Sequence, residues 1–216
     1  LEYHGGDKLF IPVENIDVLS RYGSSEEAVP LDRLGGEAWQ KRRARLKERI
    51  TAIAGELMKV AAERALKKAP VFEAEEASFN QFVDRFPWQE TEDQDAAIAD
   101  VLRDLESGKP MDRLICGDVG FGKTEVALRA AFVATMSGQQ VAVVAPTTLL
   151  ARQHYQNFTE RFAGFPLKIG RLSRLVSSKE MNETREGLSD GTVDLVVGTH
   201  AILSKSTEFK NLGLVI

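Results

Sequence analysis

The sequence predicts an α/β fold over residues 78–216, with a mainly parallel sheet covered by helices on both faces. Short strands that are apolar throughout alternate there with helical patterns, and such strands are typical of parallel sheets. A glycine-rich loop at residues 117–124 separates a predicted strand from a predicted helix. Residues 1–77 lack this alternation, so we expect them to form a separate structure.

The composition is that of an ordinary globular protein. Of the 216 residues, 43% are hydrophobic and 28% are charged, and this length allows one large or two small domains. The formal charge of -4 neither indicates nor excludes a nucleic-acid partner. Cys116 is the single cysteine, which rules out an internal disulfide and fits a reducing cytoplasm. Because the chain has no apolar run of the ~20 residues that span a bilayer and no recognisable signal peptide, we expect a cytoplasmic protein with no membrane partner.

Residues 1–24 are predicted to be the last strands of a small β barrel. Residues 8–13 form an apolar run after a Gly-Gly-Asp turn, and residues 16–19 form a second one. Pro12 favours an edge or bulge position. Two short strands cannot bury a core alone, and the chain begins with Leu rather than Met. We therefore expect it to be a piece of a longer protein.

A linker and a long helix are predicted over residues 25–77. Residues 25–36 contain Ser, Glu, Pro and a Gly-Gly pair, as linkers do. A helix over 37–68 is indicated by an apolar stripe, and Pro70 ends it. Residues 41–49 hold six basic residues and one acidic residue, so this segment is either a solvated helical face or a phosphate or partner contact. The stripe consists of Trp39, Leu46, Ile50, Ile53, Leu57 and Val60.

The elements of the α/β part follow from periodicity and breakers. Helices are predicted at 79–85, 91–106, 123–137, 149–162 and 179–188. Strands are predicted at 113–116, 141–145, 167–172, 193–197 and 214–216. Gly138 is a typical helix-ending residue.

The glycine-rich loop satisfies the pattern G-x-x-x-x-G-K-[ST], which binds nucleotide phosphates when it joins a strand to a helix. Backbone N–H groups of such a loop converge on phosphate oxygens, and the helix N-terminus adds partial positive charge. Lys123 is predicted to contact the β- and γ-phosphates, and Thr124 to bind the Mg²⁺ that accompanies ATP. These two are also the candidate catalytic residues. The predicted nucleotide-binding loop is Gly117, Asp118, Val119, Gly120, Phe121, Gly122, Lys123, Thr124 and Glu125.

Residues upstream of the loop favour adenine as the base. The Gln94 amide offers the donor and the acceptor that pair with adenine, and Phe86 could stack on the ring. Thr91 is a good N-cap for the helix that carries Gln94. The alternative interpretation is that Gln94 is an ordinary exposed helical residue that binds no base.

Segments after three other strands are candidate DNA contacts. They lie at the carboxyl ends of parallel strands, where open α/β sheets bind ligands, and hydroxyls and free N–H groups suit phosphodiesters. Taken singly, each segment is equally a helix cap. The candidates are Pro146, Thr147, Thr148, Gln153, His154, Ser173, Arg174, Gly198, Thr199 and His200.

Together these motifs resemble the first RecA-like domain of superfamily 2 helicases and translocases, and specifically the bacterial transcription-repair coupling factors. Glu92 departs from the Pro usual in that family. RecG helicases are similar over 111–127 but have a different N-terminal wedge domain. The segments that carry the closer resemblance are 111–127, 5–13, 20–22 and 34–36 before Trp39.

The resemblance implies an ATP-driven double-stranded DNA translocase that displaces stalled RNA polymerase and recruits nucleotide excision repair. It implies ATP and Mg²⁺ as cofactors. The implied partners are double-stranded DNA, the RNA polymerase β subunit at the Tudor-like domain that ends near residue 24, and the repair protein UvrA through regions outside this chain. The family's acidic Asp-Glu-Glu-His motif lies beyond residue 216, so the 216-residue chain is expected to bind nucleotide without hydrolysing it. A RecG-like fork remodeller and a polymerase-interaction module are the alternatives.

Overall fold

A computed structural model of the chain describes residues 1–20, 33 and 37–216, without the side chains of residues 38 and 39. The predicted linker 25–36, apart from Arg33, lies outside the described residues. So do the motif residues 21–22 and 34–36, and the side chain of Trp39. The chain divides into two compact units, Leu1–Glu63 and Arg64–Ile216.

The first unit does not form the strands predicted within residues 1–24. Glu2 and Lys8 make an isolated antiparallel bridge, and Val13–Val18 form a 3-10 helix, η1, after Pro12. The two-strand prediction is therefore wrong for the described residues. The physical reason is that a strand needs a continuous row of paired residues, and the described pairing of these two apolar runs is limited to the bridge at Lys8.

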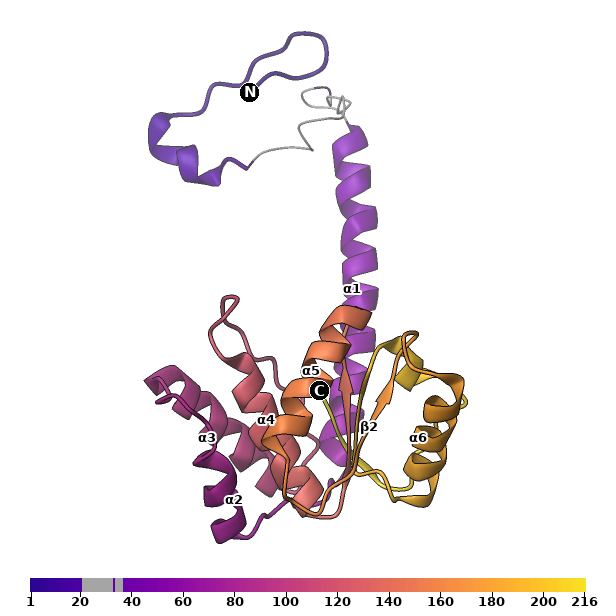
Figure 1. The fold of residues 1–216 in the computed structure, drawn as a ribbon. Helices are drawn as coiled ribbons and strands as arrows, with labels where there is room; N and C mark the ends of the chain where they lie inside the picture. Colours follow the sequence, from indigo (N-terminus) through magenta and orange to yellow (C-terminus); the bar gives the residue numbers. More distant parts are fainter. Residues whose placement is uncertain (21–32, 34–36) are drawn as a thin grey trace. The chain divides into compact units, whose positions relative to one another are not determined.

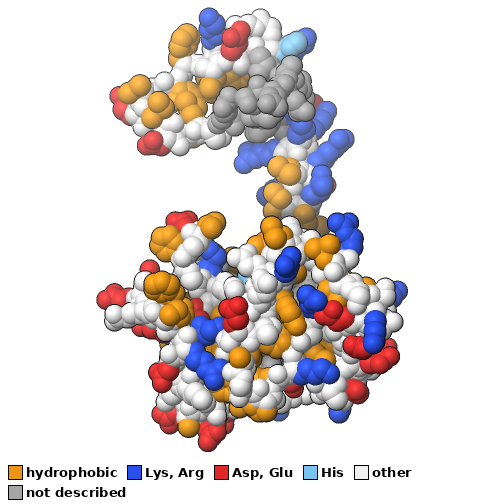
Figure 2. Space-filling view, viewed as in Figure 1, with side chains coloured by type: hydrophobic (Ala, Val, Ile, Leu, Met, Phe, Trp, Pro, Cys, Tyr) orange, Lys and Arg blue, Asp and Glu red, His pale blue; other side chains and the backbone are white. Residues whose placement is uncertain are grey.

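The long helix α1 spans Glu37–Leu66, close to the predicted 37–68 (Figure 1). Its exposed surface carries the basic side chains of residues 41–49 (Figure 2). Leu46, Ile50, Ile53 and Leu57 of the predicted stripe are more than half exposed. No helix in the described part of the chain is long and apolar enough to cross a membrane.

The second unit is the predicted α/β fold. Its four strands are all parallel, in the order β2-β3-β1-β4. The strands are β1 (Gln140–Val144), β2 (Ile169–Leu172), β3 (Leu195–Gly198) and β4 (Leu212–Val215). The helices are α2 (Glu76–Val83), α3 (Glu92–Glu106), α4 (Lys123–Met136), α5 (Thr148–Arg161) and α6 (Ser178–Asp190), with a short 3-10 helix η2 (His200–Leu203).

Alternate strand residues point into two separate cores, one on each face of the sheet. Val141 and Val143 join the larger core with α2, α3, α4 and α5. Ala142, between them, joins the smaller core with α6 and η2. Figure 1 shows α4 and α5 on one side of the sheet and α6 on the other. This two-sided burial explains why the strands are apolar throughout.

The strand predicted at 113–116 is absent. Residues 109–118 carry no regular secondary structure, although Ile115 packs against the larger core. The sheet order leaves β4 as an edge strand, but Arg113 and Ile115 line cavities beside it, and residues 113–116 form no backbone pairing with it. Residues 113–116 have the apolar pattern of a buried strand, but a strand also needs hydrogen bonds to a neighbouring strand.

Candidate functional site

The glycine-rich loop has the backbone that its glycines permit. Gly120 and Gly122 adopt φ of 88° and 71°, a left-handed conformation that favours glycine. Gly122 is the N-cap of α4, and the helix begins at Lys123. The loop therefore delivers the backbone directly into a helix N-terminus, whose N–H groups attract anions.

Lys123 folds over its own loop. Its Nζ donates to the carbonyl oxygens of Gly117 and Asp118, each at 2.6 Å. At the loop tip, Val119 and Phe121 are exposed. The Lys123 ammonium group is therefore held at the loop backbone by two hydrogen bonds. The tip of the loop is exposed to solvent.

Gln94 is joined to this loop. Thr91 and Gln94 form a reciprocal capping box at the start of α3. The Gln94 Nε2 donates to the carbonyl of Phe121 at 2.9 Å, and its Oε1 accepts from the Thr91 N–H at 2.9 Å. A Cβ at Gly122 would lie 2.3 Å from Gln94 Nε2. The predicted base-reading residue and the predicted phosphate loop are therefore in direct contact.

Phe86, which is predicted to stack on the base, lies beside two arginines. Its partly buried ring lies 5.9 Å from the Arg129 guanidinium and 5.6 Å from that of Arg161. Trp88, two residues further on, is 72% exposed. The open aromatic ring of this segment is therefore Trp88, which the sequence reasoning did not single out.

Glu125 points into the protein rather than toward the outside of the loop. It is buried, its Oε1 accepts from Arg129 Nε at 2.9 Å, and its Oε2 accepts from Arg161 Nη1 at 2.6 Å. The physical reason is its place on α4, where it faces Arg129 one helical turn later. Glu125 was predicted to bind nucleotide, but both of its carboxylate oxygens are taken by arginines.

Arg129 also forms an ion pair with Glu90. This hydrogen bond from Arg129 is the main reason that the pKa of the Glu90 carboxyl lies below its ordinary value. The i, i+4 spacing of Glu125 and Arg129 was a usable signal in the sequence. Arg161 and Glu90 are far from both in sequence and could not have been found in that way.

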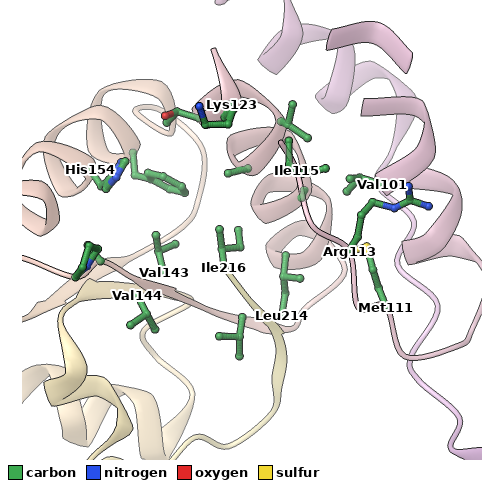
Figure 3. A pocket seen from close by; sticks show the side chains of 18 residues that line it. Val101, Met111, Arg113, Ile115, Lys123, Val143, Val144, His154, Leu214 and Ile216 are labelled. Carbon is green, nitrogen blue, oxygen red and sulfur yellow. The ribbon is translucent and has the colours of Figure 1, made fainter. Parts of the chain in front are cut away.

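A cavity of about 500 Å³ lies beside the loop (Figure 3). Lys123 is at one end of it, and Val143, Leu214 and Ile216 line the apolar part. His154 also lines it, and its buried Nδ1 has no hydrogen-bond partner among the described residues. His154, a predicted DNA contact, is thus partly turned toward this cavity. Thr124, the predicted Mg²⁺ ligand, lines the same cavity.

The sheet register brings the predicted DNA segments to one edge. Val144 of β1 and Leu172 of β2 both pair with Gly198 of β3. Because the strands are parallel, the segments that follow them leave the sheet together. The residues assembled there are Pro146, Thr147, Thr148, Ser173, Arg174, Thr199 and His200.

Only some of these residues are accessible. Ser173 and Thr199 are buried, and the Thr199 N–H donates to Leu172 at 3.0 Å. Thr147 caps α5, since its Oγ1 accepts from the Leu150 N–H at 3.2 Å. The exposed members of the predicted set are Pro146, Thr147, Gln153, Arg174 and His200.

Comparison with known proteins places the chain in a family. Residues 91–216 match the DEAD/DEAH box helicase family. The chain belongs to this family. The matched region begins at the Thr91 cap and includes the glycine-rich loop and all four strands, so the family assignment covers the geometry described above.

Curated relatives match beyond this region. The transcription-repair-coupling factor of Haemophilus influenzae is 48% identical over 100% of this chain and 19% of its own length. That of Rickettsia bellii is 51% identical over 99% of this chain and 19% of its own length. The chain therefore spans about a fifth of the curated relatives it matches. A structure of RecG bound to a three-way DNA junction superimposes with a TM-score of 0.70 at 35% identity, covering 82% of this chain and 24% of that one.

Proposed function

We propose that this chain is the nucleotide-binding part of an ATP-driven double-stranded DNA translocase of the transcription-repair coupling type. The observation that carries the proposal is the direct contact between Gln94 and the phosphate loop, in a chain whose whole length is similar to coupling factors. The similarity includes residues 1–77, which the helicase family match does not cover.

The residues of the loop fit a nucleotide phosphate. The loop backbone is open to close approach at Gly120, where a Cβ would meet nothing within 4 Å. Lys123, the N–H groups of 118–124 and the Thr124 hydroxyl would hold the phosphates and Mg²⁺. ATP, when bound, supplies the phosphoanhydride bond whose hydrolysis drives motion, and Mg²⁺ offsets phosphate charge. Lys123 then exchanges its two carbonyl partners for anionic oxygens, which make stronger charge-assisted hydrogen bonds.

Titration of the chain with ADP and Mg²⁺ in a calorimeter tests the nucleotide site. We expect binding, and we expect Lys123→Ala to weaken it by about 10- to 100-fold, because a hydrogen bond to a charged group is lost. Lys179→Ala is the matched control, since Lys179 is an exposed lysine on α6. Absence of binding by the unmodified chain, or equal binding by Lys123→Ala, would contradict the proposal.

The exposed sheet edge is the proposed DNA contact. Arg174 and His200 are exposed there, beside the N-terminus of α5, and such groups contact phosphodiesters. Arg174→Ala should weaken binding of double-stranded DNA and reduce the salt dependence by about one charge. Lys109→Ala, an exposed residue beyond α3, should leave both unchanged.

The proposed activity of the whole protein is displacement of stalled RNA polymerase and recruitment of nucleotide excision repair. The proposed partners are the RNA polymerase β subunit, reached through the domain that ends near residue 24, and UvrA, reached through regions outside this chain. Support comes from the similarity to coupling factors over residues 1–77.

A RecG-like fork remodeller is the second candidate, favoured by the similarity to a junction-bound RecG structure. Capture of purified bacterial RNA polymerase by the immobilised chain favours the coupling type. Preference for a three-way DNA junction over linear duplex, without polymerase capture, favours the remodeller.

A further inference from the structure

Four charged side chains from three segments meet inside the second unit. Glu125 and Arg129 come from α4, Arg161 comes from the end of α5, and Glu90 lies just before α3. Two of the four are acidic and two are basic, so the cluster is formally neutral. Buried ions are costly unless they are paired, and in this cluster each one has a partner of opposite charge.

Glu125 is the centre of the cluster. Its Oε1 accepts from both Arg129 Nε, at 2.9 Å, and Arg161 Nη2, at 3.0 Å, while its Oε2 accepts from Arg161 Nη1 at 2.6 Å. Arg129 then uses Nη2 to pair with Glu90. One carboxylate on the phosphate-loop helix therefore fixes two arginines, and one of these holds the segment before α3.

The same two arginines also hold the other end of that segment. The Phe86 ring lies within 6 Å of both guanidiniums, a distance at which a cation is attracted to an aromatic face. Phe86 and Glu90 thus anchor residues 86–90 at both ends. Trp88, between the two anchors, remains exposed.

Residues 86–90 lead directly into the capping box of Thr91 and Gln94, which contains the predicted base-reading residue. Thr91 follows Glu90 and forms the capping box with Gln94, which donates to Phe121 in the phosphate loop. On the other side, Glu125 follows Thr124 in the chain. The charged cluster and the nucleotide residues are therefore connected twice, once through α3 and once through α4.

We propose that Glu90, Arg129, Glu125 and Arg161 form a positioning device that holds residues 86–91 against the phosphate-loop helix, and so places the base-recognition residues relative to the phosphate loop. This inference rests on the proposed nucleotide function. Glu90 and Arg129 are positioning residues in it. The device acts on the base part of a nucleotide and leaves the phosphate part to the loop itself.

Two ligands separate these parts: ADP and inorganic tripolyphosphate, each with Mg²⁺. In the 216-residue chain, Glu90→Ala should raise the Kd for ADP about tenfold, as loss of a charged hydrogen bond would, and leave the Kd for tripolyphosphate within about twofold. Glu90→Gln, which keeps one neutral acceptor for Arg129, should fall between the unmodified chain and Glu90→Ala. Glu183→Ala is the matched control, because Glu183 is an exposed glutamate on α6.

Trp88 gives an independent signal. The chain has two tryptophans, so replacing Trp39 with Phe leaves Trp88 as the only tryptophan emitter. ADP should change its emission, tripolyphosphate should not, and Glu90→Ala should reduce the ADP response. If Glu90→Ala fails to fold, Glu90→Gln provides the same two-ligand comparison.

The outcomes are distinct. Equal weakening of both ligands by the Glu90 variants would overturn the inference, because the cluster would then act on the loop or on folding. Unchanged ADP affinity would also overturn it. Failure of the unmodified chain to bind either ligand would instead overturn the proposed function, and the inference with it.

Discussion

Gly198, a predicted DNA contact, also has a structural role in the sheet. It ends β3, and a Cβ there would lie 2.0 Å from the carbonyl oxygen of Leu172. Since backbone cannot yield cheaply, Gly198→Ala should lower the free energy of unfolding by more than about 2 kcal/mol. Urea unfolding followed by circular dichroism measures this.

Gly55→Ala is the control for that change. Gly55 lies within α1, and a Cβ there would meet nothing within 4 Å, so alanine should add about 0.5–1 kcal/mol of helix stability. Equal effects at both positions would contradict the steric argument. If Gly198→Ala also weakens DNA binding, the measured affinity must be corrected for the fraction of the protein that is folded.

The Glu90 carboxyl gives the second unit a pH-dependent contribution to stability. Arg129 donates a hydrogen bond that holds the pKa of Glu90 below its ordinary value, which is about 4.3. A carboxyl with a depressed folded-state pKa stabilises the fold above its unfolded-state pKa, and this stability is lost as the pH falls through the folded-state pKa.

The stability difference between the unmodified chain and Glu90→Gln should therefore be largest near pH 7. It should shrink below about pH 5. Urea unfolding at a series of pH values measures it. A difference that stays constant down to pH 3 would show that the carboxyl charge contributes nothing. Other titrating groups, such as Glu180 paired with Arg171, are present in both proteins and cancel.

At the scale of elements, the helices and strands that depend on local sequence pattern were predicted correctly. Helices α3, α4 and α5 have bounds within two residues of the predicted ones, because caps such as Thr91 and breakers such as Gly138 act locally. The strands at 140–144 and 195–198 were recognised because both of their faces are buried. The fold class is therefore confirmed.

The predictions that failed depended on distant partners. Residues 8–13, 16–19 and 113–116 are apolar enough for strands, but strand formation requires a neighbour that the pattern cannot reveal. The same limit applies to the site. Lys123 and Gln94 could be predicted from local motifs, whereas the burial of Glu125 depends on Arg161, which comes from another helix.

Gln140 makes contacts between separate elements that no sequence motif predicts. It begins β1, is almost fully buried, and its Nε2 donates to the carbonyls of Leu188 and Val193 at 2.9 and 2.8 Å. Its Oε1 accepts from the Asn211 N–H at 3.0 Å. One side chain thus ties the end of α6 and the approach to β4 to the sheet.

Gln140→Ala should destabilise the chain by about 2–4 kcal/mol, because the Val193 carbonyl and the Asn211 N–H lose their side-chain partner. Thermal and urea unfolding measure this loss. Gln156→Ala, on the exposed surface of α5, should change stability by less than about 0.5 kcal/mol. If the two variants were equally stable, water would have to replace the Gln140 contacts.

At the scale of the whole molecule, the described core is drawn entirely from residues 72–214. In the first unit, η1 has no buried residue, and Phe10 is 86% exposed. A chain that starts at Arg64 should therefore keep the same core. Its urea m-value should agree with that of the full chain within about 15%, because m follows the surface exposed on unfolding.

A chain that starts at Glu76 is the matched comparison for this last prediction. It removes Phe72, which is 3% exposed in the larger core, and the backbone hydrogen bond from Phe72 to Leu105. Loss of a buried phenylalanine costs about 3–5 kcal/mol, so this chain should unfold at clearly lower urea concentration. If the chain from Arg64 were destabilised to the same extent, residues 1–63 would have to support the second unit. If both chains matched the full one, Phe72 would contribute nothing to the core, against its burial. The boundary of the stable unit is therefore expected between residues 64 and 72, at the end of α1, rather than at the predicted domain start at residue 78.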